Sequence, residues 1–435
     1  MVLKGVTQMS NINTVTCHVD GFRSAFKGRD FSFILGEDLQ FHIEGEIGPD
    51  GISGIGADLL DIAASIFQVE KQISGMKGTN PPNKFKLEMA LRKPDVWDDD
   101  AQSLLTEILR ILGNASWSFE FKKGARRDIP KCEKEQSGSI DTIVLFSGGL
   151  DSTCGIISKI GERDKTRLLS YYSTHQKTLQ KDIAKGLGYK PPVQVRINWT
   201  KKNLGRGRTF YYRSFLFLSL AALLADSWKI KQILQFENGI LASAIPPAPI
   251  WMMTKHTHPS LHLQFKKLLD KLFAGNWQVK NPFLLKTKRQ ILEEAKKEAK
   301  LENTELKLSE IFEKTETCWF YWSNRVPGDK KTPGRPCGIC VPCLVRRTAL
   351  PDEKYQYNLI KDQIKNDPTK GIAFRSYYGF LKNVRNTKDS PPDFYRIIPA
   401  AGKLLISQEF VTLKELQELF LTFGEEFFHT YQIKE

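Results

Sequence analysis

The residues best suited to chemistry begin at position 141, where the chain reads Asp-Thr-Ile-Val-Leu-Phe-Ser-Gly-Gly-Leu-Asp-Ser-Thr. The apolar, β-branched run at residues 143–146 predicts a buried parallel strand. Gly148 and Gly149 then allow the backbone to turn and to approach a ligand closely. A helix that starts after them would add unsatisfied N–H donors and the positive end of its dipole. This order of elements suits a phosphate or a pyrophosphate.

Side chains complete the predicted phosphate site, which comprises Ser147, Gly148, Gly149, Asp151, Ser152 and Thr153. A carboxylate beside a phosphate is unfavourable unless it meets a metal ion or a polar substrate group. We therefore interpret Asp151, together with Ser147, as a candidate catalytic residue. The loop is not a Walker A motif, because the Gly-Lys-Ser/Thr ending is missing. The alternative is an ordinary glycine-rich turn, which is disfavoured by the number of residues that fit a phosphate-binding loop.

A second set of residues suited to chemistry is a group of three cysteines spaced as in a turn, Cys337-Gly-Ile-Cys340-Val-Pro-Cys343. Cys318 lies upstream, across a loop rich in Pro, Gly and Lys. Four thiolates suit a tetrahedral zinc ion, although the same spacing could hold an iron–sulfur cluster. A site with all four positions filled by protein would be structural rather than catalytic.

Composition limits the class of protein. The 435 residues, 41% of them hydrophobic, suit a globular chain of two or three domains. A formal charge of +15 favours anionic partners, but no Arg/Lys block is dense enough to favour a nucleic acid. We see no signal peptide, and the longest apolar run, residues 215–225, is too short to cross a membrane. Seven cysteines with three of them clustered fit a reducing compartment, so we expect a cytoplasmic protein.

From residue 137 to residue 350 the pattern alternates strand and helix, which predicts an α/β domain with a parallel sheet. We expect strands at 143–146, 167–173, 193–197 and 230–236, with a mostly apolar helix at 208–227. Ligands bind beyond the carboxyl ends of such strands. Further polar groups fall at those ends, and we expect them to bind the ligand: His175, Glu237, Asn238 and Gly239.

The flanking regions look like separate units. Residues 1–136 suggest an α+β domain with a hairpin at 30–45, a helix at 57–73 and a linker at 122–138. Residues 351–435 suggest a helical extension, with amphipathic helices at 352–365 and 412–431.

Two local patterns between these regions are also informative. Thr287 is a candidate N-cap for a helix that runs to about residue 301. His256, His258 and His262 could suggest a metal site, but no carboxylates accompany them, so we favour a polar loop.

Ser-Gly-Gly-x-Asp-Ser after a strand resembles the PP-loop of ATP pyrophosphatases. With Cys318 and Cys-Gly-x-Cys-x-x-Cys-x-x-Arg behind it, the region 141–350 resembles the QueC family of 7-cyano-7-deazaguanine synthases. Other residues match that family in order: His175, Arg213, Pro282, Lys288 and Arg346. The family's Gly-Gln-Arg before the histidine is absent here, and its Arg-Asn pair is Arg213-Ser214. The two extensions resemble the QueC-like proteins of bacterial anti-phage defence systems, the QatC type in particular.

The resemblance implies a PP-loop, HUP-like nucleotide domain that uses ATP, Mg²⁺ and zinc to adenylate a deazaguanine carboxylate. An amine, carried by a partner protein from a defence operon, would then capture the adenylate. Lys288 and Arg213 would stabilise charge on the phosphates or the carboxylate, and His175 would shuttle a proton or hydrogen-bond the ligand. We expect the extensions to dock the partner. Three alternatives stay open: a synthase that uses ammonia, a tRNA-modifying PP-loop enzyme, and a non-catalytic nucleotide-binding subunit.

Overall fold

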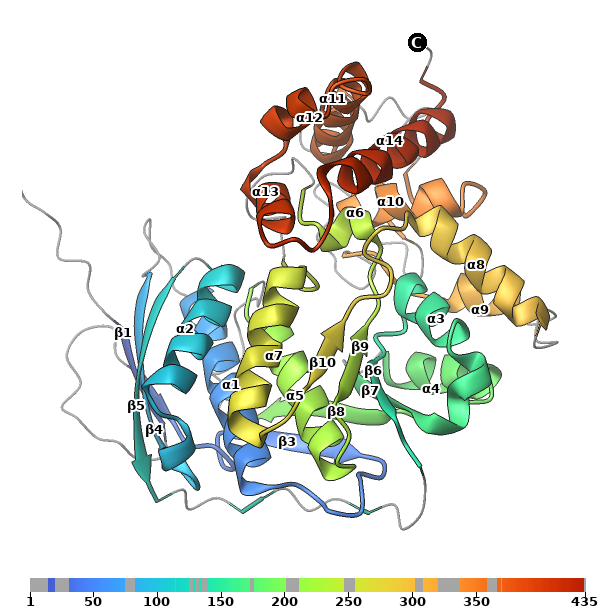
Figure 1. The fold of residues 1–435 in the computed structure, drawn as a ribbon. Coiled ribbons are helices and arrows are strands. Elements are labelled where there is room, and N and C mark those ends of the chain that lie inside the picture. The colour runs from blue at the N-terminus through green and yellow to red at the C-terminus, as the bar shows by residue number, and fades with distance from the viewer. Residues whose placement is uncertain are drawn as a thin grey trace, which may run out of the picture.

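The computed structural model of the chain describes residues 15–19, 31–74, 83–113, 115–124, 128–129, 133–134, 139–172, 176–200, 211–245, 255–301, 308–319, 336–357, 366–368 and 370–433. Within them lie two sheets, with helices packed between and beside them, and a cluster of helices near the C-terminus (Figure 1). None of the helices in these ranges is both long and apolar enough to cross a bilayer.

The first sheet has the order β2-β1-β4-β5, and its strands pair in parallel. The strands are β1 (Val15–Val19), β2 (Phe31–Phe33), β4 (Lys84–Leu91) and β5 (Ser116–Lys123). Helices α1 (Gly54–Ser74) and α2 (Asp99–Gly113) cover one face, and the short 3-10 helix η1 (Pro94–Val96) follows β4. Buried residues of β4 alternate with less buried ones, because successive side chains of a strand point to opposite faces.

The second sheet has the order β10-β9-β6-β7-β8-β3, parallel except that β3 runs antiparallel to β8. Its strands are β3 (Leu39–Glu44), β6 (Thr142–Leu145), β7 (Thr166–Tyr171), β8 (Val193–Trp199), β9 (Gln232–Gln235) and β10 (Gln278–Lys280). The predicted parallel α/β pattern is therefore present, with β6, β7, β8 and β9 within a few residues of their predicted positions, whereas β10 was not predicted.

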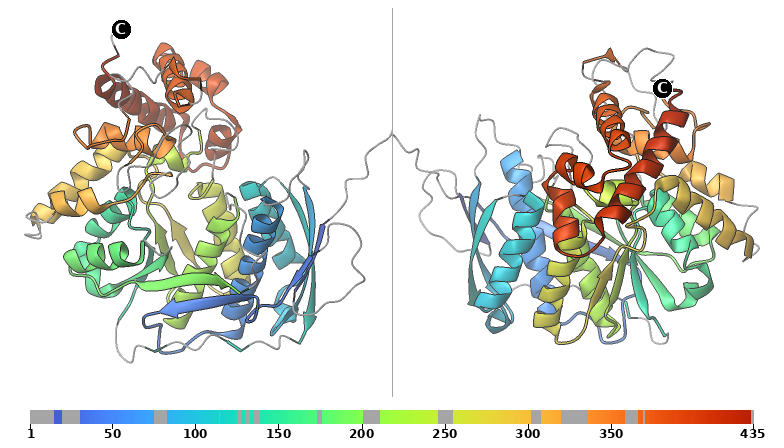
Figure 2. Two further views of the ribbon diagram at one scale, coloured as in Figure 1. Left: turned by 180° about the vertical axis from the view of Figure 1, so that it is seen from behind. Right: turned by 45° about the horizontal axis from the view of Figure 1, so that its top comes forward.

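Helices cover both faces of the second sheet. One group comprises α5 (Arg213–Ser227) and α7 (Pro259–Phe273), which pack against α1 and α2 and so join the two sheets in one core. The other comprises α3 (Leu150–Ile157), η2 (Ile160–Lys165), α4 (Gln176–Gly186), α8 (Lys288–Leu301) and α9 (Leu308–Lys314) (Figures 1 and 2). Contact with a sheet on one side and with α1 on the other explains why α5 is apolar around most of its circumference.

The predicted hairpin at residues 30–45 is wrong. β2 joins the first sheet and β3 joins the second, where it pairs with β8. Alternating polarity indicates a half-buried strand but does not identify its partner. The boundary at residue 136 also does not divide the core, since residues before it supply an edge strand of the second sheet and helices that pack on α5 and α7.

The C-terminal helices form a second core of their own. They are α10 (Val341–Ala349), α11 (Ile372–Asn386), α12 (Pro391–Ile397), α13 (Ala400–Ser407) and α14 (Leu413–Thr430). The short helix α6 (Gly239–Ala242) contacts α14, so this core reaches the end of β9. The predicted helix at 352–365 is not seen at residues 352–357, which form turns and bends, and residues 358–365 lie outside the described ranges.

The two predicted helix starts are confirmed. Thr412 caps α14 in a capping box with Glu415. Thr287 caps α8, because its Oγ1 accepts a 3.2 Å hydrogen bond from the Gln290 amide while its own amide donates to Gln290 Oε1 at 2.9 Å. This cap sets the position of Lys288, the first residue of α8.

Candidate functional site

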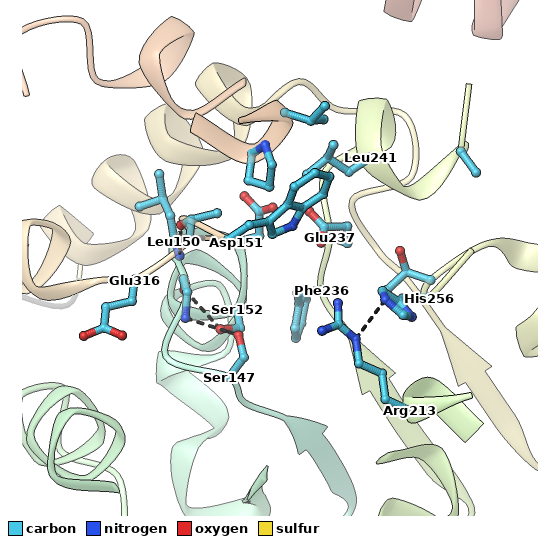
Figure 3. Close-up of a pocket in the computed structure, with 17 residues that line it drawn as sticks. Ser147, Leu150, Asp151, Ser152, Arg213, Phe236, Glu237, Leu241, His256 and Glu316 are labelled. Carbon is cyan, nitrogen blue, oxygen red and sulfur yellow. Dashed lines mark hydrogen bonds between the residues drawn. The ribbon is translucent and has the colours of Figure 1, made fainter. Parts of the chain in front are cut away.

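The glycine loop lies where the sequence predicts it, between the carboxyl end of β6 and the start of α3. Gly148 has φ +79°, a conformation that L side chains rarely adopt, and Gly149 precedes the first residue of the helix. Ser147 Oγ accepts a 3.2 Å hydrogen bond from the Gly149 amide and lies 3.1 Å from Ser152 Oγ (Figure 3). The first amides of α3 have no partner within the helix, so the loop presents donors to an anion.

Two adjoining cavities open at this loop. The first, of about 250 Å³, is lined by Ser147, Gly149, Asp151, Ser152 and Glu237 among others. The second, of about 420 Å³, has more aromatic walls, including Phe67, Tyr171 and Phe217. Both are lined by Ser147 and Ser152 of the loop, and both are also lined by Arg213, Phe236 and His256. A ligand with an anionic part and a planar apolar part fits this pair of cavities.

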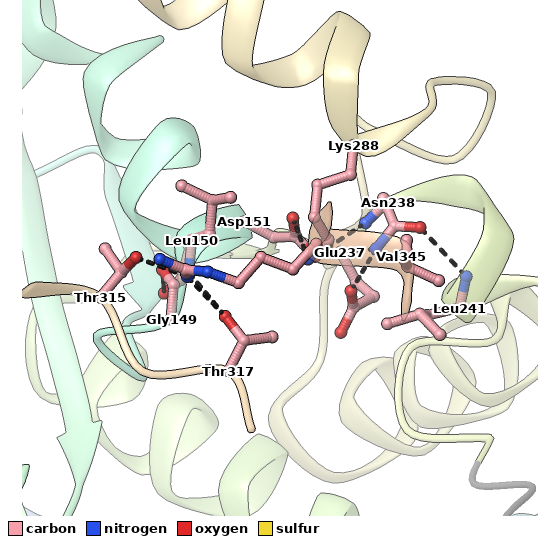
Figure 4. Close-up of polar contacts among 12 residues, drawn as sticks. Gly149, Leu150, Asp151, Glu237, Asn238, Leu241, Lys288, Thr315, Thr317 and Val345 are labelled. Atoms are coloured by element: carbon pink, nitrogen blue, oxygen red, sulfur yellow. Dashed lines mark hydrogen bonds and ion pairs between the residues drawn. The ribbon is translucent and has the colours of Figure 1, made fainter. Parts of the chain in front are cut away.

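Asp151 is paired with Lys288, which the sequence did not predict. The ammonium lies 2.7 Å from both carboxylate oxygens, and the Asn238 amide donates to Oδ2 at 2.9 Å (Figure 4). Lys288 is 0% exposed and lines neither cavity, so it reaches ligands through Asp151 rather than directly. A metal ion is therefore not needed to neutralise Asp151.

Asp151 and Glu237, the two carboxyl groups that line the first cavity, differ in charge. Burial opposes ionisation of Asp151, but the Lys288 ammonium and hydrogen bonds outweigh it and lower the pKa to about 2. Burial and the Asp151 charge raise the pKa of Glu237 well above its ordinary value, so Glu237 holds a proton. One ionised and one protonated carboxyl thus face the first cavity.

Some of the predicted ligands serve the fold instead. Thr153 is 0% exposed within α3 and lines neither cavity. Gly239 is needed for packing, since a Cβ there would lie 2.0 Å from the Leu284 carbonyl oxygen. Asn238 caps α6 through a 3.2 Å bond from the Leu241 amide while holding Asp151 and Glu237. Of the predicted phosphate ligands, Ser147, Gly149, Asp151 and Ser152 line the first cavity.

Arg213 is a half-buried cation with a neutral hydrogen-bond partner. Its Nε donates to His256 Nε2 at 2.9 Å, and His256 Nδ1 hydrogen-bonds Ser214 Oγ. Burial and the Arg213 charge lower the pKa of His256 well below its ordinary value, so the imidazole is neutral. Among the described residues no carboxylate forms an ion pair with Arg213, and the positive end of α5 adds to its unfavourable environment. The site thus has room for an anion at the junction of the cavities.

The expectation that the three histidines form a polar loop is wrong. His258 is 0% exposed and caps α7 by accepting from the Ser260 amide, and His262 is 4% exposed and bonds Gln235. His256 is the member that lines the two cavities, where it accepts a hydrogen bond from Arg213. His175 lies outside the described residues.

The four predicted cysteines come together although Cys318 is far from the others in sequence. All four Sγ atoms lie within 4.8 Å of one another, with 3.9 Å between Cys337 and Cys343 and 4.0 Å between Cys340 and Cys318. Zinc–sulfur bonds of about 2.3 Å in a tetrahedron require about 3.8 Å between sulfurs. In a [2Fe–2S] or [4Fe–4S] cluster the four thiolates are divided among two or four irons, which sets sulfurs on different irons farther apart. The cluster could therefore hold a single metal ion such as zinc.

Backbone donors around the sulfurs support this interpretation. The amides of Ile339 and Cys340 donate to Cys337 Sγ at 3.4 Å, and the Cys337 amide donates to Cys318 Sγ at 3.3 Å. Such bonds stabilise thiolates and orient them for an ion. The turn they define, with Gly338 at φ +81°, leads into α10, which has Cys340 as its N-cap.

The sequence did not predict one wall of the first cavity. Glu316, Thr317 and Trp319 line it, as do Val341 and Pro342 at the start of α10. Proximity to the four cysteines in sequence was the available signal, but nothing local indicated that this segment touches the glycine loop.

Comparison with models of known protein families gives no match for the chain, and comparison with curated proteins gives no significant match.

Proposed function

We propose that the chain is a PP-loop ATP pyrophosphatase that adenylates a carboxylate. One observation carries the proposal: a glycine loop with N–H donors and an arginine that has no carboxylate partner among the described residues line the same cavity at the carboxyl edge of the second sheet. The loop suits the phosphates of ATP, and the arginine suits a second anion. Resemblance to the QueC family supports the same reaction.

In the proposed reaction, the substrate carboxylate oxygen attacks the α-phosphorus of ATP. The bond from that phosphorus to the bridging oxygen breaks, and pyrophosphate leaves. Ser147, Ser152 and the first amides of α3 hold the departing charge, while Arg213 holds the carboxylate in line for attack. An amine then attacks the acyl carbon, the bond to AMP breaks, and the amine loses a proton.

A magnesium ion carried by ATP would be held by the ionised carboxylate of Asp151, and Glu237 would join it only on losing its proton. When bound, that ion neutralises charge on the phosphates. Lys288 acts behind them as a positioning residue, because it keeps Asp151 ionised and fixed in place.

The finer identity of the substrate and partner is also a proposal. We infer a deazaguanine carboxylate and an amine on a partner protein, as the family resemblance implies. A tRNA-thiolating enzyme with an iron–sulfur cluster is the less favoured candidate, because the sulfur spacing suits a single ion. Docking of a partner on the extensions remains a prediction, and deletion of residues 1–136 cannot test it cleanly, since it would remove β3 and α1.

Ser147 provides the sharpest test. We expect Ser147→Ala to lower the rate of AMP and pyrophosphate formation roughly 10- to 100-fold, since a hydrogen bond to a charged group contributes about 1.5–3 kcal/mol. The measurement is AMP release from ATP with 7-carboxy-7-deazaguanine and an amine. Ser158→Ala, at the far end of α3, is the matched control and should retain the full rate. Equal rates for the wild type and Ser147→Ala would remove the loop from the reaction.

A further inference from the structure

One segment of the chain touches both the glycine loop and the cysteine cluster. The Glu316 amide donates to the Gly148 carbonyl at 3.2 Å, and Thr317 Oγ1 lies 3.5 Å from the Leu150 amide. The next residue, Cys318, places its Sγ among the other three thiols. Because one residue spans at most about 3.6 Å, a displacement of Cys318 must move Thr317 as well.

The helix that carries the other thiols reaches the same wall. Cys340 caps α10, and the two residues after it, Val341 and Pro342, line the first cavity. Cys343 follows directly. The two chain segments that supply the four cysteines therefore also form a wall of the cavity into which the glycine loop faces.

Arg346 joins the two segments. It is 1% exposed, and its Nη1 donates to Thr315 Oγ1 at 2.7 Å and to Thr317 Oγ1 at 3.1 Å (Figure 4). Glu353 neutralises the guanidinium, with its carboxylate 2.7 Å from Arg346 Nε. Since Thr317 Oγ1 accepts from Arg346, its own hydrogen is free to be donated into the cavity that Thr317 lines.

We propose that Thr317 is a further phosphate donor, and that a metal ion on the four cysteines and a nucleotide on the glycine loop strengthen each other's binding through it. The metal would fix Cys318 and so hold Thr317 beside Leu150. The bound phosphate would in turn hold Thr317 and slow the release of Cys318 from the metal. Thermodynamic linkage requires the effect to be reciprocal. This inference rests on the proposed nucleotide site but requires no turnover.

The test is the rate at which the zinc-loaded full chain loses zinc to a chromogenic chelator, with and without saturating ATP. Couplings between sites are typically 5- to 150-fold, so we expect ATP to slow zinc loss at least about fivefold. Inorganic pyrophosphate should protect as well, because the proposed contact is to phosphate. Calorimetry on the same samples measures ATP binding independently.

Thr317→Val keeps the shape of the side chain and removes its hydroxyl. We expect this variant to bind one zinc per chain, to lose most of the protection by ATP, and to bind ATP more weakly. Thr315→Val is the matched control, because Thr315 also accepts from Arg346 but does not line the cavity. It should keep the protection.

The outcomes separate this inference from the proposed function. If ATP binds but does not change zinc loss, the coupling is wrong and the proposed function stands. If Thr317→Val retains full protection, Thr317 is not the connection. If ATP does not bind to the zinc-loaded chain, both proposals are wrong.

Discussion

Two half-buried arginines, one beside each sheet, have opposite surroundings. Arg92 follows β4 of the first sheet, and its Nη1 lies 2.9 Å from Asp58 Oδ1 and 2.6 Å from Asp61 Oδ2. Asp58 also accepts from the amides of Arg92 and Lys93. Arg213 beside the second sheet has only a neutral histidine and no carboxylate ion pair among the described residues.

This contrast distinguishes a charged group that stabilises the fold from one that would serve the proposed function. A buried ion is costly unless its charge is paired, so a pair closed within the fold contributes to stability and asks nothing of a ligand. A half-buried cation that lines a cavity and has no ion pair among the described residues has its cost reduced when an anion arrives. The charges beside the first sheet are thus paired without a ligand, whereas Arg213 beside the second sheet would gain a partner from the ligand of the proposed function.

Arg92→Met should cause the largest loss of stability. It leaves Asp58 and Asp61, both buried, without their shared cation, and breaking a buried pair costs about 3–5 kcal/mol. Chemical denaturation should place the free energy of unfolding lower by about that amount.

Arg213→Met is the matched control for that measurement. It removes a cation that has no ion pair, so we expect stability to change by less than about 1 kcal/mol, while AMP formation should fall at least tenfold. An Arg213→Met protein as unstable as Arg92→Met would mean that both arginines are structural, and the comparison would fail.

Lys288→Met tests the one closed ion pair inside the site. It leaves the Asp151 carboxylate buried without its cation, with hydrogen bonds from Asn238 and Glu237, and we expect a loss of about 3–4 kcal/mol with no detectable AMP formation. Asp151→Ala should likewise destabilise the fold, because it strands the Lys288 ammonium.

The double variant Asp151→Asn with Lys288→Met separates stability from chemistry. It removes both charges, so stability should return towards that of the wild type while activity stays absent. Restored activity in this double variant would contradict a role for the Asp151 charge.

Local signals predicted much of this molecule. The strand–glycine–helix order around Ser147, the cap at Thr287, the helix that starts at Thr412, and most strands and helices follow from patterns within a few residues. The cysteine cluster followed from spacing and from the chemistry of thiolates.

Long-range pairings could not be predicted in this way. Lys288 meets Asp151 across 137 residues, and β3 pairs with β8 rather than with its neighbour in sequence. Thr317 reaches the glycine loop because the cysteine cluster brings its segment there. Each of these depends on the completed fold, and periodicity carries no information about it.

Of the predicted changes in stability, we expect the smallest from Glu426 on α14, an acidic residue whose situation is the opposite of that of Arg213. It is 7% exposed and faces Thr287, whose Oγ1 donates to Glu426 Oε1 at 2.7 Å, while no hydrogen bond reaches Oε2 from the described residues. An arginine cannot lose its proton, so it remains charged until an anion binds. A carboxyl can take up a proton instead, and burial, partly offset by Thr287 and Arg289, raises the pKa of Glu426 to about 7.

The sign of the pH dependence follows from that direction. The pKa is higher in the folded chain than in the unfolded chain, so the contribution of Glu426 to stability is present in full below about pH 4.5 and is lost as pH rises through about 7. We expect the melting temperature of the wild type to fall between pH 5 and pH 8, with a loss on the order of 1–3 kcal/mol from this group. Glu426→Gln keeps the acceptor for Thr287 without a charge, and should flatten that fall and stabilise the protein at pH 8. Glu425→Gln changes an exposed neighbour on the same helix and should leave the slope as it is. If the slope is unchanged in Glu426→Gln, the Glu426 carboxyl ionises in the folded chain as readily as in the unfolded chain. A charge without an ion pair would then be tolerated in this part of the fold, and the missing ion pair of Arg213 would not by itself indicate a binding site.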